Sequence, residues 1–405
     1  MSSGGPSRSG ELQAAGGAGE LIERARAAGR LALDTEFMGE GRYRTLLCLI
    51  QLAAPELADG GESIALVDPL RDDVELDPLA GALADPDVRI VVHAGRQDIA
   101  LLRRELGTEV TNIFDTQVAA GFAGLGAQVS YDSLLTDVLG LRVAKTASFT
   151  RWDARPLSAE QLAYAREDVV HLLELASELE RRLAELGRLD WALEECRPLS
   201  LVSDERDPQA IFERLPRVGG LNASARAVAR ELVEWRERTA ERQNRPVQSV
   251  LSDAGLVEVA RRRPASGEDL AKIRGVGASA QGRRARELLD AVARARRRRA
   301  EPPPQGVRHP PPKPEDLPLV ALAESLVRTR SREAGLAYEL LASRADLQAV
   351  VAAARTGESA PDVRTLRGWR AGLVGDELLQ LLDGHVRLSV ERDGPVRRLR
   401  VEPRE

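Results

Sequence analysis

The chain has 405 residues, of which 43% are hydrophobic, 30% are charged and only 3% are aromatic. This length allows two or three domains, with cores built mainly from Leu, Val and Ala. Two cysteines, Cys48 and Cys196, and four histidines are too few for a disulfide scaffold or a cysteine-ligated zinc site, and no apolar stretch is long enough to span a membrane. Residues 1–20 are rich in Gly, Ser and Ala and lack the order of a signal peptide, which predicts a disordered tail on a cytoplasmic protein.

The net charge of −5 conceals an uneven distribution along the chain. Residues 1–200 carry a net charge of −13, residues 201–300 carry +8, and residues 301–405 are neutral. An acidic block followed by a basic block is typical of a carboxylate-rich site beside a polyanion-binding module, although an unevenly charged helical surface gives the same pattern. Arginine outnumbers lysine by 55 to 3, which we attribute to a GC-rich genome rather than to function.

Residues 21–187 alternate between strand-like and helix-like patterns, which indicates an α/β domain with a mixed sheet. Apolar runs bounded by turn residues predict five strands, over Arg30–Phe37, Thr45–Ala53, Ser63–Val67, Val88–His93 and Glu109–Phe114. Helices are predicted over Gln97–Leu106, over Thr116–Phe122 and from Ser158 to about Leu186. The last of these begins with a capping box formed by Ser158 and Gln161.

The remainder of the chain is predicted to be mostly helical. Residues 209–295 form a small basic unit without a convincing strand. The basic run Arg294–Arg299 and the prolines that follow it predict an extended spacer. A second helical unit is predicted from Glu315 to about Leu388, and the last residues are expected to be frayed.

Acidic side chains occur at three places where an active site could form. Asp34 and Glu36 are two residues apart on a strand and therefore point to the same face. Asp98 falls in the first turn of a helix, and Tyr164 and Asp168 share one helix face. Each feature also has a purely structural interpretation: a strand end that reaches solvent, a residue that starts a helix, and a buried hydrogen bond.

The combination of these residues favours a metal site. Four carboxylates that meet at one sheet edge cannot all ionise without a strong cation. Oxygen ligands without Cys or His favour Mg²⁺ or Mn²⁺. Two such ions would stabilise an in-line phosphoryl displacement, and Tyr164 would orient the attacking water.

Five segments of residues 21–187 resemble the ribonuclease D branch of the 3′–5′ exonucleases, in the family's order and approximate spacing. They are DTEF at 34–37, HAGRQD at 93–98, IFDTQ at 113–117, RPLS at 155–158 and YAREDV at 164–169. The resemblance implies a ribonuclease H-like mixed sheet with flanking helices. It also implies that Asp34, Glu36, Asp98 and Asp168 are ligands of two metal ions, with Tyr164 as the water-orienting catalytic residue. Asp115, in the third segment, is expected to cap a helix or to lie behind the metal ligands.

The helical units also resemble known modules. Residues 209–295 resemble the HRDC module shared by RecQ-type helicases and ribonuclease D, through WRER at 235–238, NRPVQSVLSDAGLVEVARRRP at 244–264 and IRGVG at 273–277. The segment GWRAGLVGDELLQLL at 368–382 resembles the extra C-terminal helical module of bacterial ribonuclease D proteins. The expected organisation is a disordered tail at 1–20, the exonuclease domain at 21–200, an HRDC domain at 207–296, an Arg/Pro-rich linker at 297–314, a second HRDC-like domain at 315–390 and a tail at 391–405.

Five basic residues are weaker candidates for nucleic-acid contacts. Phosphate binding and ordinary solvated charge explain the presence of these residues equally well. The five residues are Lys145, Arg151, Arg155, Lys272 and Arg274.

The resemblance implies a hydrolase that uses Mg²⁺ or Mn²⁺ to remove nucleotides from RNA 3′ ends, releasing nucleoside 5′-monophosphates. Its expected partners are structured RNAs with a 3′ tail, such as tRNA precursors, and we expect a monomer that does not bind membranes. One alternative is a DNA 3′–5′ exonuclease with the same metal chemistry. Another is a non-catalytic nucleic-acid-binding protein, which predicts a missing ligand, and none of the four carboxylates is missing.

Overall fold

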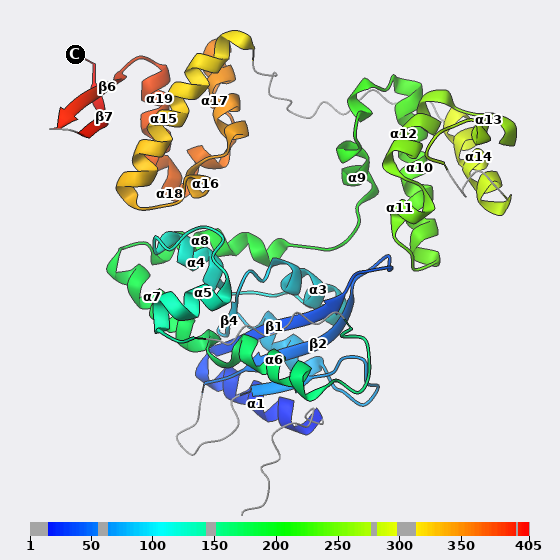
Figure 1. Cartoon of the computed structure of the whole chain (residues 1–405), viewed down its shortest axis with the longest axis horizontal. Helices are drawn as coiled ribbons and strands as arrows, with labels where there is room; N and C mark the ends of the chain where they lie inside the picture. The colour runs from blue at the N-terminus through cyan, green and yellow to red at the C-terminus, as the bar shows by residue number, and fades with distance from the viewer. Residues whose placement is uncertain are drawn as a thin grey trace, which may run out of the picture.

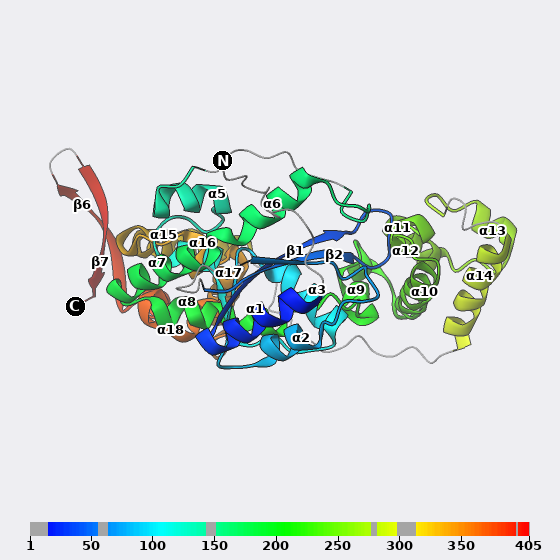
Figure 2. The ribbon, with the colours of Figure 1, turned by 90° about the horizontal axis from the view of Figure 1, so that it is seen from below.

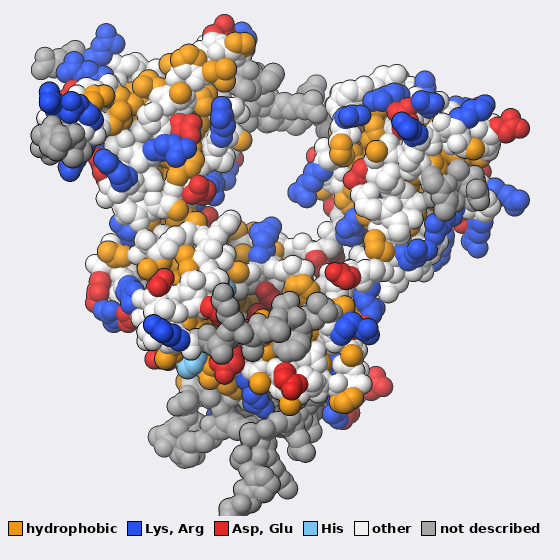
Figure 3. All heavy atoms as spheres, viewed as in Figure 1, with side chains coloured by type: hydrophobic (Ala, Val, Ile, Leu, Met, Phe, Trp, Pro, Cys, Tyr) orange, Lys and Arg blue, Asp and Glu red, His pale blue; other side chains and the backbone are white. Residues whose placement is uncertain are grey.

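The protein forms three bodies at the corners of a triangle (Figure 1). The computed structural model describes residues 15–55, 64–142, 151–276, 282–297, 313–393 and 396–404. We refer to residues 15–202 as the α/β domain, to residues 208–297 as the first helical body and to residues 313–404 as the second helical body. A space-filling view shows an open space between the three bodies (Figure 3). No helix of the described ranges is long and apolar enough to cross a membrane.

The α/β domain contains a five-stranded mixed sheet in the order β3-β2-β1-β4-β5. Its strands are β1 (Arg30–Met38), β2 (Leu46–Ala53), β3 (Ile64–Val67), β4 (Arg89–Val92) and β5 (Ile113–Asp115). Strands β1, β4 and β5 are parallel, whereas β2 is antiparallel to both β1 and β3. The predicted fold class is confirmed. The fifth strand is shorter than expected, because Asn112 adopts a left-handed backbone conformation just before it (φ 46°).

Helices cover both faces of the sheet (Figure 2). The helices of the domain are α1 (Ala15–Ala28), α2 (Asp77–Ala84), α3 (Arg96–Leu106), α4 (Thr116–Phe122), α5 (Tyr131–Leu134), α6 (Ala159–Val170), α7 (Leu172–Glu185) and α8 (Leu189–Cys196). Successive side chains of β1 point to opposite faces of the sheet. Leu31 and Leu33 are buried with α1, α2 and α3, whereas Ala32 is buried with α4 and α7. This alternation follows from the two-residue period of a strand.

Two expectations for the α/β domain were wrong at their boundaries. The predicted disordered tail at 1–20 overlaps helix α1, which begins at Ala15. That helix is ordered because Leu21, Ile22 and Ala25 are buried against the sheet. Residues 1–14 lie outside the described residues. The long helix expected after Ser158 is divided into α6 and α7 at His171, whose ψ of 4° departs from helical geometry.

The first helical body surrounds the long central helix α10. Its helices are α9 (Pro208–Arg214), α10 (Ala223–Arg242), α11 (Val247–Val250), α12 (Asp253–Arg262), α13 (Gly267–Ala271) and α14 (Gly282–Arg297). Arg and Lys side chains gather on the face of this body that Figure 3 shows. The turn between β1 and β2 contacts it, because the Tyr43 hydroxyl donates to Glu237 (3.2 Å) and the Tyr43 amide donates to Asn244 (3.2 Å).

The second helical body ends in a two-stranded ribbon. Its elements are α15 (Leu317–Ala334), α16 (Tyr338–Leu341), α17 (Arg344–Thr356), α18 (Gly368–Arg370), α19 (Asp376–Leu382), β6 (Val386–Asp393) and β7 (Val396–Pro403). The expectation of a frayed tail at 391–405 was therefore wrong, since most of this segment forms strand β7. Alternating residues explain the ribbon: Val386, Leu388 and Val401 pack against the core, while Arg387 on the other face pairs with Glu402 (3.2 Å). Of the linker expected at 297–314, residues 298–312 lie outside the described residues.

The second helical body shares one hydrophobic core with the α/β domain. Trp369 stacks on Trp191 of α8, with ring centroids 5.1 Å apart, and meets Phe122 of α4 edge-on at 5.0 Å. The Arg188 guanidinium donates to the carbonyl oxygens of Phe122 (3.0 Å) and Ala334 (2.5 Å), and so joins the two parts. The second helical body is thus packed onto the α/β domain through helices α4 and α8.

Candidate active site

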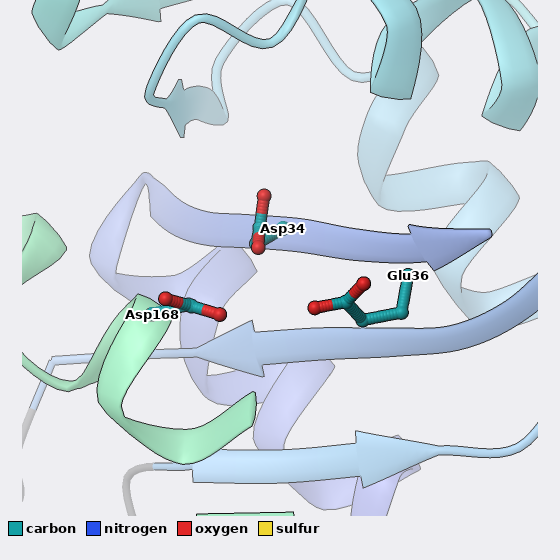
Figure 4. Close-up of side chains that lie close together, drawn as sticks. All are labelled: Asp34, Glu36 and Asp168. Atoms are coloured by element: carbon teal, nitrogen blue, oxygen red, sulfur yellow. The ribbon is translucent and has the colours of Figure 1, made fainter. Parts of the chain in front are cut away.

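Three carboxylates from two elements converge on one face of the sheet (Figure 4). Asp34 and Glu36 extend from β1 toward α6, and Asp168 extends from α6 toward β1. Each carboxylate has an oxygen within 4.8 Å of an oxygen of the other two. The arrangement follows from local periodicity, because residues two apart on a strand share a face and α6 packs across that face.

Local interactions determine how α6 presents its side chains. The helix begins at a capping box, in which the Ser158 hydroxyl accepts from the Gln161 amide (3.2 Å) and the Gln161 side chain accepts from the Ser158 amide (2.9 Å). Its apolar stripe, including Ala165, packs on the sheet. Tyr164 and Asp168 are one turn apart, and the Tyr164 hydroxyl hydrogen-bonds to the Asp168 carboxylate.

Asp98 does not join the three-carboxylate group. It lies in the first turn of α3, a helix that packs on the opposite face of the sheet, and is only 8% exposed. Its carboxylate accepts a hydrogen bond from the Thr35 hydroxyl, and Thr35 points away from the face that carries Asp34 and Glu36. Asp98 is nevertheless a neighbour of the group, because its charge raises the pKa values of both Asp34 and Glu36.

Burial and mutual repulsion raise the pKa values of these acids. The pKa of Asp34 is raised well above its ordinary value, first by burial and then by the charges of Asp98, Asp168 and Glu36. Burial, followed by the charge of Asp168, raises the pKa of Glu36 to about 8. Burial, followed by the charge of Asp132, raises the pKa of Asp168 to about 7. The group therefore tends to retain protons at neutral pH unless a cation neutralises it.

The residues of the cluster fit a divalent cation. One oxygen of Asp168, Oδ2, is buried and has no hydrogen-bond partner among the residues that the structure describes. A buried carboxylate oxygen without a partner is costly, and a metal ion would satisfy it. Carboxylate oxygens without nitrogen or sulfur ligands suit hard cations such as Mg²⁺ and Mn²⁺.

The raised pKa values predict how the metal-free protein depends on pH. An acid whose pKa is higher in the folded state stabilises the fold at low pH, and this stabilisation is lost as the pH rises from about 4 to about 8. Asp168→Asn removes one of these acids. It should stabilise the metal-free protein at pH 8 by about 1–3 kcal/mol, and by distinctly less at pH 5.

Thermal denaturation in EDTA at the two pH values measures this effect. Asp72→Asn, at an exposed position away from the cluster, is the control and should show no pH-dependent gain. A lower melting temperature for Asp168→Asn than for the wild type at pH 8 in EDTA would contradict the prediction.

The basic candidates for nucleic-acid contacts have different environments. The guanidinium of Arg155 is bound within the protein, because it donates to both oxygens of Asp68 (2.6 and 2.5 Å) and to the Cys48 carbonyl (2.7 Å). This bidentate ion pair makes Arg155 a poorer candidate for a phosphate contact than the exposed basic residues. Arg151 and Lys272 are exposed, and they pair with Asp153 at 3.1 Å and with Asp269 at 3.3 Å, respectively.

Two further candidates complete this set. Arg274 is exposed on the first helical body. Lys145 lies outside the described residues.

Tyr131 lies beside the site and was not predicted from the sequence. It begins the short helix α5, its ring centroid is 5.6 Å from that of His93, and its hydroxyl is buried. Burial raises the pKa of Tyr131, and the charges of Asp168 and Asp34 raise it further. The residue has no partner at a regular spacing in the sequence, so only the tertiary fold reveals its position.

The sheet order and the carboxylate cluster define a divalent-metal nuclease domain followed by helical modules. Residues 13–184 match the family model described as 3′–5′ exonuclease, and residues 225–292 match that of the HRDC domain. The Ribonuclease D of Gluconacetobacter diazotrophicus is 39% identical over 377 residues, which cover 92% of each chain. That of Acidiphilium cryptum is 36% identical over 371 residues, which cover 91% of this chain and 92% of the relative.

The chain belongs to the ribonuclease D family, and it is a hydrolase, a 3′–5′ exoribonuclease. Its fold is similar to the crystal structure of Escherichia coli RNase D, which is described as an exoribonuclease involved in structured RNA processing. That similarity has a TM-score of 0.75 at 28% identity and covers 91% of this chain and 96% of the other. The expected family, fold class and type of enzyme are confirmed. Family membership also implies the use of divalent metal ions.

Proposed function

We propose that this enzyme trims the 3′ ends of structured RNAs such as tRNA precursors, and that it releases nucleoside 5′-monophosphates with the help of two Mg²⁺ or Mn²⁺ ions. The observation that carries the proposal is the convergence of Asp34, Glu36 and Asp168 within 4.8 Å. We further propose that the enzyme is monomeric and cytoplasmic. Its catalytic unit would lie in residues 21–200, followed by two HRDC-type modules that an Arg/Pro-rich linker separates.

In this proposal the carboxylates hold the metal ions. Asp34, Glu36 and Asp168 offer oxygens on the α6 side of β1, and the unpartnered Asp168 oxygen supports their assignment as ligands. Asp98, whose charge already acts on Asp34 and Glu36, would contribute by exchanging its hydrogen bond from Thr35 for a metal contact. When bound, the ions lower the pKa of the attacking water and stabilise the charge that develops on the phosphate.

Tyr164 would orient the attacking water. Burial raises the pKa of its hydroxyl, and the neighbouring charge of Asp168 raises it further, so the hydroxyl remains protonated at neutral pH. A protonated phenol cannot act as a base, but it can donate one hydrogen bond and accept another. The ring lies near Trp152, with centroids 6.1 Å apart, which limits its movement. Tyr164 therefore suits positioning of the water rather than deprotonation.

The helical bodies would bind the RNA upstream of its 3′ end. Residues 201–300 carry a net charge of +8, and contacts with phosphates give binding that tolerates many sequences and weakens with salt. The similarity to Escherichia coli RNase D, which takes part in structured RNA processing, supports a substrate with a folded body and a free tail.

The proposal is tested with a 5′-labelled tRNA precursor that has a single-stranded 3′ tail, an unstructured RNA of equal length and a DNA copy. We expect a ladder that shortens from the 3′ end in Mg²⁺ or Mn²⁺ and stops in EDTA, with nucleoside 5′-monophosphates identified by mass spectrometry. Trimming should stop at the folded body of the precursor. Products that carry a 3′-phosphate, shortening in EDTA, or a preference for DNA would each contradict the proposal.

A further inference from the structure

The turn between β4 and α3 has a conformation that needs external support. Ala94 adopts a left-handed backbone with φ of 52°, which costs a non-glycine residue about 1–2 kcal/mol. A Cβ atom on the next residue, Gly95, would lie 2.5 Å from the Val92 side chain, so only glycine fits there. Gly95 precedes α3 and cannot cap the helix with a side chain. The amides of this turn therefore require an acceptor from elsewhere in the fold.

Asp115 supplies that acceptor. Its Oδ1 accepts from the Ala94 amide (3.0 Å) and its Oδ2 accepts from the Gly95 amide (2.9 Å). The residue is 2% exposed, and such charge-assisted bonds are strong when water is excluded. The pairing arises because β4 and β5 are parallel neighbours with Val92 opposite Asp115, so both strands end at the same sheet edge.

The same carboxylate also caps the helix that follows β5. Its Oδ1 accepts from the amide of Gln117 (2.8 Å), at the start of α4. A second contact joins the two turns, because His93 Nδ1 lies 3.0 Å from the Thr116 hydroxyl. That hydroxyl donates to the Val92 carbonyl (3.1 Å). A helix cap alone would need only the α4 contact, whereas Asp115 also holds the preceding β4–α3 turn.

The supported turn leads directly into Asp98. Helix α3 begins at Arg96, one residue after the turn, and Asp98 lies in its first turn. We propose that Asp115 is a positioning residue for the metal site, which holds the β4–α3 turn so that Asp98 reaches the metal ions. This inference rests on the proposed function, in which Asp98 is a ligand. Asp115 itself touches neither metal nor substrate.

The test compares Asp115→Asn with Asp207→Asn in the full chain. Asp207 is the matched control, because its carboxylate caps α9 by accepting from the amides of Gln209 (3.0 Å) and Ala210 (3.1 Å), far along the chain from the carboxylates. An asparagine retains one acceptor oxygen but cannot accept from both Ala94 and Gly95 in the same way. Calorimetric titration with Mn²⁺ measures metal affinity, and RNA trimming at graded Mn²⁺ measures the concentration for half-maximal activity.

We expect Asp115→Asn to weaken Mn²⁺ binding about 10- to 100-fold and to raise the half-maximal Mn²⁺ concentration by a similar factor. High Mn²⁺ should restore much of its activity, and Asp207→Asn should leave both quantities unchanged. Wild-type Mn²⁺ affinity in Asp115→Asn, with only a lower melting temperature, would overturn the inference. Asp115 would then serve only as the cap of helix α4.

If Asp115→Asn does not fold, Thr116→Val removes the second contact between the turns and should weaken Mn²⁺ binding in the same direction. Unchanged Mn²⁺ affinity in that variant would then overturn the inference. Failure of the wild type to bind Mn²⁺ or to trim RNA would instead refute the proposed function, so the two failures are distinguishable.

Discussion

Asp34→Asn is expected to reduce RNA trimming by at least about 1,000-fold, which corresponds to about 4 kcal/mol of lost transition-state stabilisation. Asp34 has three acidic neighbours in the cluster. After burial, the charges of Asp98, Asp168 and Glu36 all raise its pKa. Any cation that neutralises the group would therefore interact with its charge. Asparagine has nearly the same shape, so the change removes charge and one acceptor without opening a cavity.

Single-turnover kinetics on 5′-labelled RNA and Mn²⁺ titration measure the two consequences. The variant should fold normally, and in EDTA at pH 8 it should melt no lower than the wild type, because one repelling carboxylate is gone. Asp72→Asn, at an exposed position in a loop of the α/β domain, is the control and should trim RNA at the wild-type rate. A trimming rate within tenfold of the wild type would exclude Asp34 as an essential ligand.

Trp369→Ala is expected to destabilise the protein by about 3–5 kcal/mol, the cost typical of removing a buried tryptophan. The side chain is 7% exposed and lies between Trp191 of α8 and Phe122 of α4. Its removal should leave a cavity at the junction between the second helical body and the α/β domain. The two parts should then unfold less cooperatively.

Chemical denaturation followed by circular dichroism and differential scanning calorimetry measures this effect. Trp369→Phe keeps an aromatic ring at the junction and should cost distinctly less than the alanine variant. Trp235→Ala, within the core of the first helical body, should leave the junction intact. If Trp369→Ala unfolded with the wild-type midpoint, the shared core would not contribute to stability.

Several features of the site were predictable because they depend on short-range periodicity. The two-residue spacing of Asp34 and Glu36 places both on one face of β1. The four-residue spacing of Tyr164 and Asp168 places them one turn apart on α6, and the capping box that starts this helix forms as predicted. Such patterns are set by the geometry of a single strand or helix and need no knowledge of its neighbours.

Other features depend on contacts between residues far apart in the chain. Arg155 was a candidate for RNA binding, but its guanidinium is held by Asp68, 87 residues earlier. Asp98 comes from helix α3, where its carboxylate accepts from Thr35 while its charge acts on Asp34. No local pattern distinguishes a free arginine from a paired one, or one face of a sheet from the other.

The sequence by itself determined the class of fold, the family, the acidic residues of the site and which of them share an element. Only the tertiary structure decided that three carboxylates meet while Asp98 remains with Thr35, that Asp115 links two turns, and that the C-terminal body joins the core through Trp369. The physical reason is that periodicity fixes directions within one element, whereas distances between elements are set by how their buried faces pack together.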